Sequence, residues 1–239
     1  MNVGHFASLE TIEVDNPLSW QGKTFLTFDI DWANDAVLAD AIEIIEKAAV
    51  PATWFVTHST PLIKRLRSNP NFTLGIHPNF NDLLAGQAEG NRTHAKEIVL
   101  NLLELIPEAK VLRSHSLVQS ERLVDLFHAC GITHISNFFI PEEAGPQRPW
   151  HLWDGMVCTP HVWQDNVSMR LNGVVSPPKG GKGLQIYDFH PIHVFLNTER
   201  VERYESARPF FQQPDTLRNH RLKNGLGTRD VLLGLLESP

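Results

Sequence analysis

The sequence predicts an α/β protein built on a parallel sheet. Apolar, strand-like runs alternate with helix-like segments from residue 24 to residue 137. The strand-like runs are almost continuously apolar, which is typical of parallel strands buried on both faces. Most of these runs are followed directly by Asp, His or Arg. Together these observations predict a parallel sheet or barrel with crossover helices and polar residues at its carboxyl edge.

The elements follow from hydrophobic spacing and turn residues. Strands are expected at 24–30, 52–57, 72–76, 110–113, 133–137 and 184–189, with an edge strand near 11–14. Helices are expected at 35–48, 60–68, 95–105, 120–130 and 228–236. Asn34 or Asp35 can cap the first helix, Pro51 stops it, and Gly131 ends the fourth.

The chain reads as a single domain over residues 1–239. Residues 1–22 form a lead-in, and residues 199–239 form a polar C-terminal extension. The Gly- and Pro-rich stretch 173–183 is expected to be a mobile loop. No internal repeat and no clear linker divides the 239 residues, a length that suits one large α/β domain.

Composition excludes several classes of function. Lys and Arg number 21 against 27 Asp and Glu, so the net charge of −6 argues against a nucleic-acid partner. No run of 18 apolar residues predicts a membrane span, and the N-terminus lacks a signal-like pattern, so a cytoplasmic location is expected. Two cysteines against twelve histidines mean that any metal site must use nitrogen and oxygen ligands.

Polar residues that can do chemistry gather where the predicted strands end. They are Asp29, Asp31, His58, His77, Arg113, His115, His190 and His193. In a parallel α/β barrel the active site is built at this rim. Asp29 and Asp31, two apart on an extended segment, point the same way. Their mutual repulsion favours a nearby cation over the alternative of two helix-capping residues.

His77, Asn81 and Arg113 each have two possible interpretations. His77 is either a metal ligand or a structural residue, and Asn81, four positions later, is either a weak oxygen ligand or a cap. Arg113 lies in an apolar run, so it is either buried with a carboxylate partner, for which Asp29 is the candidate, or a surface residue. His190 directly ends its strand and is preferred over His193 as a proton donor near neutral pH.

The motifs resemble those of the polysaccharide deacetylases, the NodB homology family. The resemblance is carried in order by Thr-Phe-Asp-Ile-Asp at 27–31, Ala-Thr-Trp-Phe-Val at 52–56, Gly-Ile-His at 75–77, Arg113, and Tyr-Asp-Phe-His at 187–190. The residues of these motifs resemble those of the WbmS-like subgroup, which is linked to bacterial surface-glycan genes. The resemblance spans about residues 24–193.

This resemblance implies a deformed (β/α) barrel of about seven parallel strands and a divalent metal, often zinc. It also implies removal of N-acyl groups from amino sugars. By position, Asp29 would be the general base and Asp31 and His77 metal ligands. Arg113 would tether Asp29, and His190 would be the general acid.

The sequence departs from the family pattern twice. Ile30 separates the two aspartates, which are adjacent in many members, and Asn81 stands where the family has its second metal histidine. Either Asn81 binds the metal, or His58, His115 or His193 replaces it, or the site is weak or lost.

The expected function is metal-dependent hydrolysis of an N-acetyl or N-formyl group from an amino sugar, in a surface-glycan precursor. Trp32, His115, Trp163 and His193 are candidates to line the sugar pocket, with plain core or rim roles as the alternative, and Asp165 can orient a histidine. Two other functions remain open. One is hydrolysis of a small non-sugar amide on the same fold, and the other is carbohydrate binding without catalysis.

Overall fold

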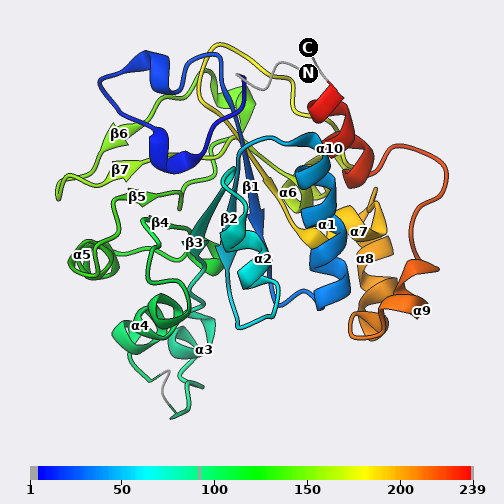
Figure 1. Ribbon diagram of the computed structural model, residues 1–239, viewed down its shortest axis with the longest axis horizontal. Helices are drawn as coiled ribbons and strands as arrows, with labels where there is room; N and C mark the ends of the chain where they lie inside the picture. The colour runs from blue at the N-terminus through cyan, green and yellow to red at the C-terminus, as the bar shows by residue number, and fades with distance from the viewer. Residues whose placement is uncertain (1–4, 91–92, 238–239) are drawn as a thin grey trace.

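The computed structural model describes residues 5–90 and 93–237, which form a curled, mostly parallel sheet flanked by helices (Figure 1). The nine strands lie in the order β6-β7-β5-β4-β3-β2-β1-β9-β8. They are β1 (Thr24–Asp29), β2 (Ala52–Val56), β3 (Phe72–Ile76), β4 (Val111–Leu112), β5 (His134–Ile135), β6 (Trp150–His151), β7 (Val157–Cys158), β8 (Trp163–Gln164) and β9 (Gln185–Phe189). The curled sheet makes a half-barrel.

The predicted α/β class is confirmed, with two differences in the strands. Every neighbouring pair in the sheet is parallel except β6 with β7, which is antiparallel. The sheet has more strands than the expected seven, because β6, β7 and β8 were not predicted. Each of these strands is two residues long, which is too short to show periodicity. The edge strand expected near 11–14 is wrong, since residues Leu9–Thr11 form a 3-10 turn instead.

Ten helices are described. They are α1 (Asp35–Ala48), α2 (Ile63–Ser68), α3 (Asn81–Leu84), α4 (Ala95–Leu105), α5 (Glu121–Ala129), α6 (Asp165–Asn172), α7 (Pro191–Leu196), α8 (Val201–Ala207), α9 (Pro214–Arg218) and α10 (Thr228–Glu237). The Asn34 side chain accepts the backbone N–H of Ala36 at 3.0 Å, so it caps α1 as expected. Among the described residues, no helix is long and apolar enough to cross a membrane.

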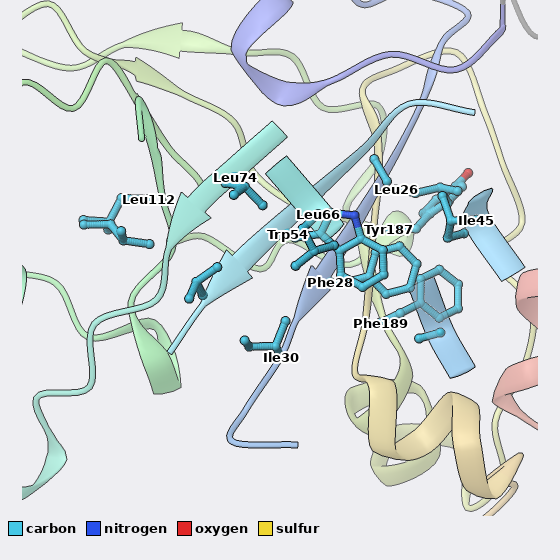
Figure 2. Close-up of a cluster of buried hydrophobic side chains, with 14 of the residues drawn as sticks. Leu26, Phe28, Ile30, Ile45, Trp54, Leu66, Leu74, Leu112, Tyr187 and Phe189 are labelled. Atoms are coloured by element: carbon cyan, nitrogen blue, oxygen red, sulfur yellow. The ribbon is translucent and has the colours of Figure 1, made fainter. Parts of the chain in front are cut away.

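The main core lies between the central strands and the helices around α1. Phe28 of β1 stacks on Trp54 of β2, with ring centroids 4.3 Å apart, and on Phe189 of β9 at 5.8 Å (Figure 2). All three side chains are fully buried. This aromatic stack joins the three strands whose carboxyl ends deliver Asp29, Thr57 and His190 to one rim.

Hydrogen bonds join the C-terminal part of the chain to helix α1. Asp40 of α1 accepts hydrogen bonds from Arg221, at 3.3 Å, and from Arg229. Helix α7 packs against both α1 and α10, as the right side of Figure 1 shows. The segment after residue 199 is therefore packed on the same framework that positions α7.

The buried Trp54 ring should contribute strongly to the free energy of unfolding. We expect Trp54→Ala to lower the free energy of unfolding by about 3–5 kcal/mol, because a large buried side chain leaves a cavity. Trp153 is 63% exposed, so Trp153→Ala should change it by about 0.5 kcal/mol or less. Urea unfolding monitored by circular dichroism measures both, and equal losses for the two variants would contradict this account of the core.

Candidate active site

The carboxyl ends of the parallel strands bring the predicted polar residues to one rim. Asp29 ends β1, while His77, Arg113 and His190 each follow the last residue of β3, β4 and β9. Asp165 follows β8 directly as the first residue of α6. The sequence reasoning that strand ends meet at one edge thus places these groups together.

The chain leaves the sheet between the two aspartates. Strand β1 ends at Asp29, Ile30 is fully buried, and Asp31 and Trp32 adopt left-handed backbone angles, with φ of 38° and 54°. The extended segment expected across Asp29–Asp31 is therefore wrong. The turn, held where the Trp32 backbone N–H donates to Thr57 Oγ1 at 3.1 Å, still carries Asp31 to the rim.

Asp31, His77 and His115 form a compact triangle of ligand-type atoms. His77 Nε2 lies 3.4 Å from Asp31 Oδ1, His115 Nδ1 lies 3.2 Å from the same oxygen, and the two ring nitrogens are 3.3 Å apart. Burial alone would raise the pKa of Asp31, but hydrogen bonds from His115 and His77 and the charge of His190 hold it well below its usual value. The two histidine rings of the triangle therefore favour the ionised form of the Asp31 carboxylate.

The other residues that the sequence offers as possible metal ligands lie outside this triangle. Asn81 is exposed at the start of α3, and its side-chain amide donates to Ser116 Oγ at 3.1 Å. The His58 ring is bonded through Nδ1 to Thr57 Oγ1 at 2.8 Å. His193 Nδ1 contacts Thr198 Oγ1 at 3.2 Å. Of the three substitutes considered from the sequence, His115 is the one that faces Asp31 and His77.

Arg113 is fully buried and holds Asp29, as expected from the sequence. Its Nη1 donates to Asp29 Oδ1 at 3.0 Å, to Thr27 Oγ1 at 3.0 Å and to Asp188 Oδ1. Its Nε and Nη2 donate to the carbonyl and hydroxyl oxygens of Ser136 at 3.2 and 3.0 Å. The guanidinium is thereby fixed by strand-end groups on every side.

Asp188 is a site residue that the sequence reasoning missed. It lies in β9, fully buried, and its Oδ2 has no hydrogen-bond partner among the described residues. Burial, opposed by the charge of Arg113 and assisted by that of Asp29, raises the pKa of Asp188 to about 7. The available signal was an acid inside an otherwise apolar strand, two residues before His190.

His190 is oriented by Asp165. Its Nδ1 lies 2.7 Å from Asp165 Oδ1, and its backbone N–H donates to Asp165 Oδ2 at 2.8 Å. Its Nε2 is 3.5 Å from Asp31 Oδ2. Burial disfavours the charged ring, but the charge and hydrogen bond of Asp165, with the charges of Asp31 and Asp188, raise the pKa of His190 well above its usual value.

A pocket of about 380 Å³ opens beside this cluster. It is lined by Asp31, His115, His190 and Trp32, and the Trp32 side chain is 43% exposed. His193 also lines the pocket, and burial lowers its pKa to about 4, so its ring is neutral. The volume falls in the range of small-ligand sites.

The position of Trp163 differs from the sequence-based expectation, and the contribution of the C-terminal segment to the pocket was not predicted. Trp163 is buried, donates its indole N–H to the Ser176 carbonyl at 2.9 Å, and lines a separate cavity. Helix α8 and the following turn supply pocket walls through Tyr204 and Phe211. The polar composition of the segment after residue 199 gave no signal of this contribution.

The strand ends of the half-barrel bring together the carboxylates, histidines and arginine of the motifs found in the sequence. The family model described as "WbmS-like: Polysaccharide deacetylase" matches residues 26–208. The chain belongs to this WbmS-like polysaccharide deacetylase family, a family of hydrolases.

Similar proteins are found among solved structures. A Bordetella bronchiseptica protein, provisionally described as a polysaccharide deacetylase involved in O-antigen biosynthesis, is 42% identical, with 99% of this chain and 98% of that chain covered and a TM-score of 0.91. A Mycobacterium smegmatis protein, also provisionally described as a polysaccharide deacetylase, is 16% identical over 90% and 84% of the two chains, with a TM-score of 0.49. A comparison with curated proteins gives no match.

The pairing of His190 with Asp165 predicts its protonation state. In chelator-treated protein at pH 7, we expect the His190 ring to be an imidazolium, and Asp165→Asn to lower its pKa because the partner charge is lost. Imidazole nitrogen shifts in a two-dimensional NMR titration measure this.

The same pairing has a consequence for stability. A raised folded-state pKa stabilises the protein fully below the unfolded value of about 6.5, and this contribution is lost as pH rises through the folded pKa. The stability difference between wild type and Asp165→Asn should therefore be greatest at acidic pH. A difference that grows with increasing pH would contradict the assigned charge on His190.

Proposed function

We propose that this protein is a metal-dependent carbohydrate N-deacylase that hydrolyses an N-acetyl or N-formyl group on an amino sugar of a surface-glycan precursor. The observation that carries the proposal is the Asp31–His77–His115 triangle beside two supported acid–base groups, Asp29 and His190. The family membership and the O-antigen description of the 42%-identical relative support the substrate class.

The spacing of the triangle suits a small divalent cation. Its three sides measure 3.2, 3.3 and 3.4 Å. Zinc bonds of about 2.0–2.2 Å in tetrahedral geometry separate ligand atoms by about 3.3–3.6 Å. Two imidazoles and one carboxylate are ligands that zinc accepts readily. We therefore assign Asp31, His77 and His115 as ligands and zinc as the preferred metal.

This assignment gives Asn81 a supporting part. Its side-chain amide holds Ser116, the neighbour of His115 in the loop after β4. Ser116 and Leu117 have left-handed φ angles of 57° and 55°, so this loop needs such anchors to keep its shape. Asn81 thus stabilises the loop that presents His115 rather than taking the third ligand position itself.

The chain's own groups supply proton transfer on both sides of the amide. When bound, the metal supplies Lewis-acid polarisation of the acyl oxygen and acidifies water. Asp29, oriented by Arg113, takes the proton from the attacking water, which adds to the acyl carbon. His190, held by Asp165, gives its proton to the departing amine nitrogen as the C–N bond breaks. The products are a free amine and a carboxylic acid.

The pocket fits a small, ring-shaped substrate. Trp32 presents an exposed indole at the rim, and flat aromatic faces pack well on sugar rings. The neutral His193 offers a hydrogen-bonding ring nitrogen without adding charge. Tyr204, in the C-terminal helix α8, adds a phenol hydroxyl to the pocket lining. These groups make a site for one sugar unit with an N-acyl arm directed to the triangle.

The ligand assignment is tested by paired substitutions. We expect His115→Ala and Asp31→Ala to lose stoichiometric zinc, because each removes a vertex of the triangle, and Asn81→Ala to retain it. Elemental analysis after zinc supplementation and removal of free metal measures occupancy. Loss of zinc in Asn81→Ala with full occupancy in His115→Ala would restore Asn81 as the ligand.

The base assignment is tested by Asp29→Asn. This variant keeps the shape of the side chain and the three ligands, so it should retain zinc while kcat for deacylation falls by about 10²–10⁴. Free-amine release from N-acetyl and N-formyl amino sugars measures the rate. A fully active Asp29→Asn variant would remove Asp29 from this role.

The substrate class is tested on the same assay. Turnover of acylated amino sugars well above that of linear and cyclic non-sugar amides supports the proposal. Turnover restricted to the non-sugar amides would make the protein a different amidohydrolase. Glycan binding with neither zinc nor turnover would make it a carbohydrate-binding protein.

A further inference from the structure

Two buried carboxylates share one arginine at this site. Arg113 Nη1 carries two N–H groups, yet three oxygens surround it, on Thr27, Asp29 and Asp188. Thr27 Oγ1 also lies 2.9 Å from Asp188 Oδ1, so its hydroxyl can donate there. Asp188 is thus held by both Arg113 and Thr27, while Asp29 meets the guanidinium through Oδ1.

The second oxygen of Asp29 points the other way. Asp29 Oδ2 lies 3.7 Å from His77 Nε2, one vertex of the proposed metal triangle. The two other nitrogens of Arg113, Nε and Nη2, donate to Ser136, so a second bond to Asp29 is available only from the N–H of Nη1 that Asp188 takes. Such a contact would use both oxygens of Asp29 and draw Oδ2 away from the triangle.

The cluster of Asp29, Asp188 and His190 could itself be read as a metal site, since their ligand atoms lie within 4.8 Å of one another. Arg113 argues against that reading. Its guanidinium bonds to both carboxylates and is packed 4.6 Å from the centre of the Phe55 ring. The cationic position between Asp29 and Asp188 is already filled.

We propose that Asp188 is a positioning residue that holds the Arg113 guanidinium, so that Asp29 is bound through one oxygen and keeps the other directed to the metal triangle. The proposal rests on the deacylase function proposed above. It also explains why a carboxylate lies buried in β9 beside Arg113, where its Oδ2 has no hydrogen-bond partner in the part of the chain that the structure describes. Asp188 touches neither substrate nor metal in this scheme and acts through Arg113.

The first test is structural and needs no activity. In crystal structures of Asp188→Leu and Asp188→Ala we expect Arg113 to bond to both oxygens of Asp29, with Oδ2 displaced from His77. Leu and Ala differ in volume, so at least one should pack without strain. An Arg113–Asp29 contact that stays at Oδ1 alone in the variant that crystallises would overturn the proposal, whatever the substrate proves to be.

The second test separates positioning from simple stability. Both variants should lower kcat by about 10–100-fold, since small displacements of a reacting group have effects of this size, while KM and zinc content stay near wild type. Asp188→Asn keeps an acceptor oxygen and should recover part of kcat. Because Asp29 still pairs with Arg113, we expect Asp188→Leu, which leaves less empty volume than Asp188→Ala, to keep Tm nearer to wild type while both variants lose kcat.

A control marks the effect of losing a buried polar group in the same sheet. Thr53 of β2 is buried and its hydroxyl accepts the Leu9 backbone N–H at 3.3 Å. Thr53→Val should change Tm modestly and leave kcat unchanged. If the Asp188 variants behave like Thr53→Val, with altered Tm and unchanged kcat, Asp188 is only structural. If wild type itself shows no deacylation, the function proposal fails, and the crystal structures still decide the role of Asp188.

Discussion

The buried Arg113 is the interaction on which the geometry of the site depends. It follows β4 yet reaches Thr27 and Asp29 of β1, Ser136 after β5 and Asp188 of β9. A buried guanidinium without carboxylate partners would be strongly destabilising. The paired charges therefore require the strand ends to meet in one arrangement, and this same requirement fixes where the proposed base lies.

The backbone around the rim is shaped to serve these side chains. Consecutive left-handed residues at Asp31 and Trp32, and again at Ser116 and Leu117, cost conformational energy. The first turn brings a carboxylate and an exposed indole to the pocket, and the second brings His115 to the triangle. Both are held by side-chain hydrogen bonds, from Trp32 N–H to Thr57 and from Asn81 to Ser116.

Sequence patterning predicted the central strands, five of the ten described α-helices and the rim, because these depend on hydrophobic spacing and strand polarity. It could not find the two-residue strands after residue 141, where periodicity has no length in which to appear. It named Arg113 as the partner of Asp29 correctly, since a buried arginine needs an acid. The choice among Asn81, His58, His115 and His193 depends on loop angles that no local pattern encodes. Asp188 was overlooked because a lone acid in an apolar strand gives no spacing signal.

The charges of the cluster bear on what the triangle can hold. Four carboxylates converge on the rim, Asp29, Asp31, Asp165 and Asp188, against the cations Arg113 and His190. Burial alone would lower the pKa of His77, but the charges of Asp29 and Asp31 raise it above its usual value, so the rim favours groups that carry positive charge. Asp188, with its pKa raised to about 7, can take up a proton when the balance shifts. The electrostatics thus favour a positive charge at the triangle, where the spacing of the ligand atoms is 3.2–3.4 Å, and the proposed metal would supply it.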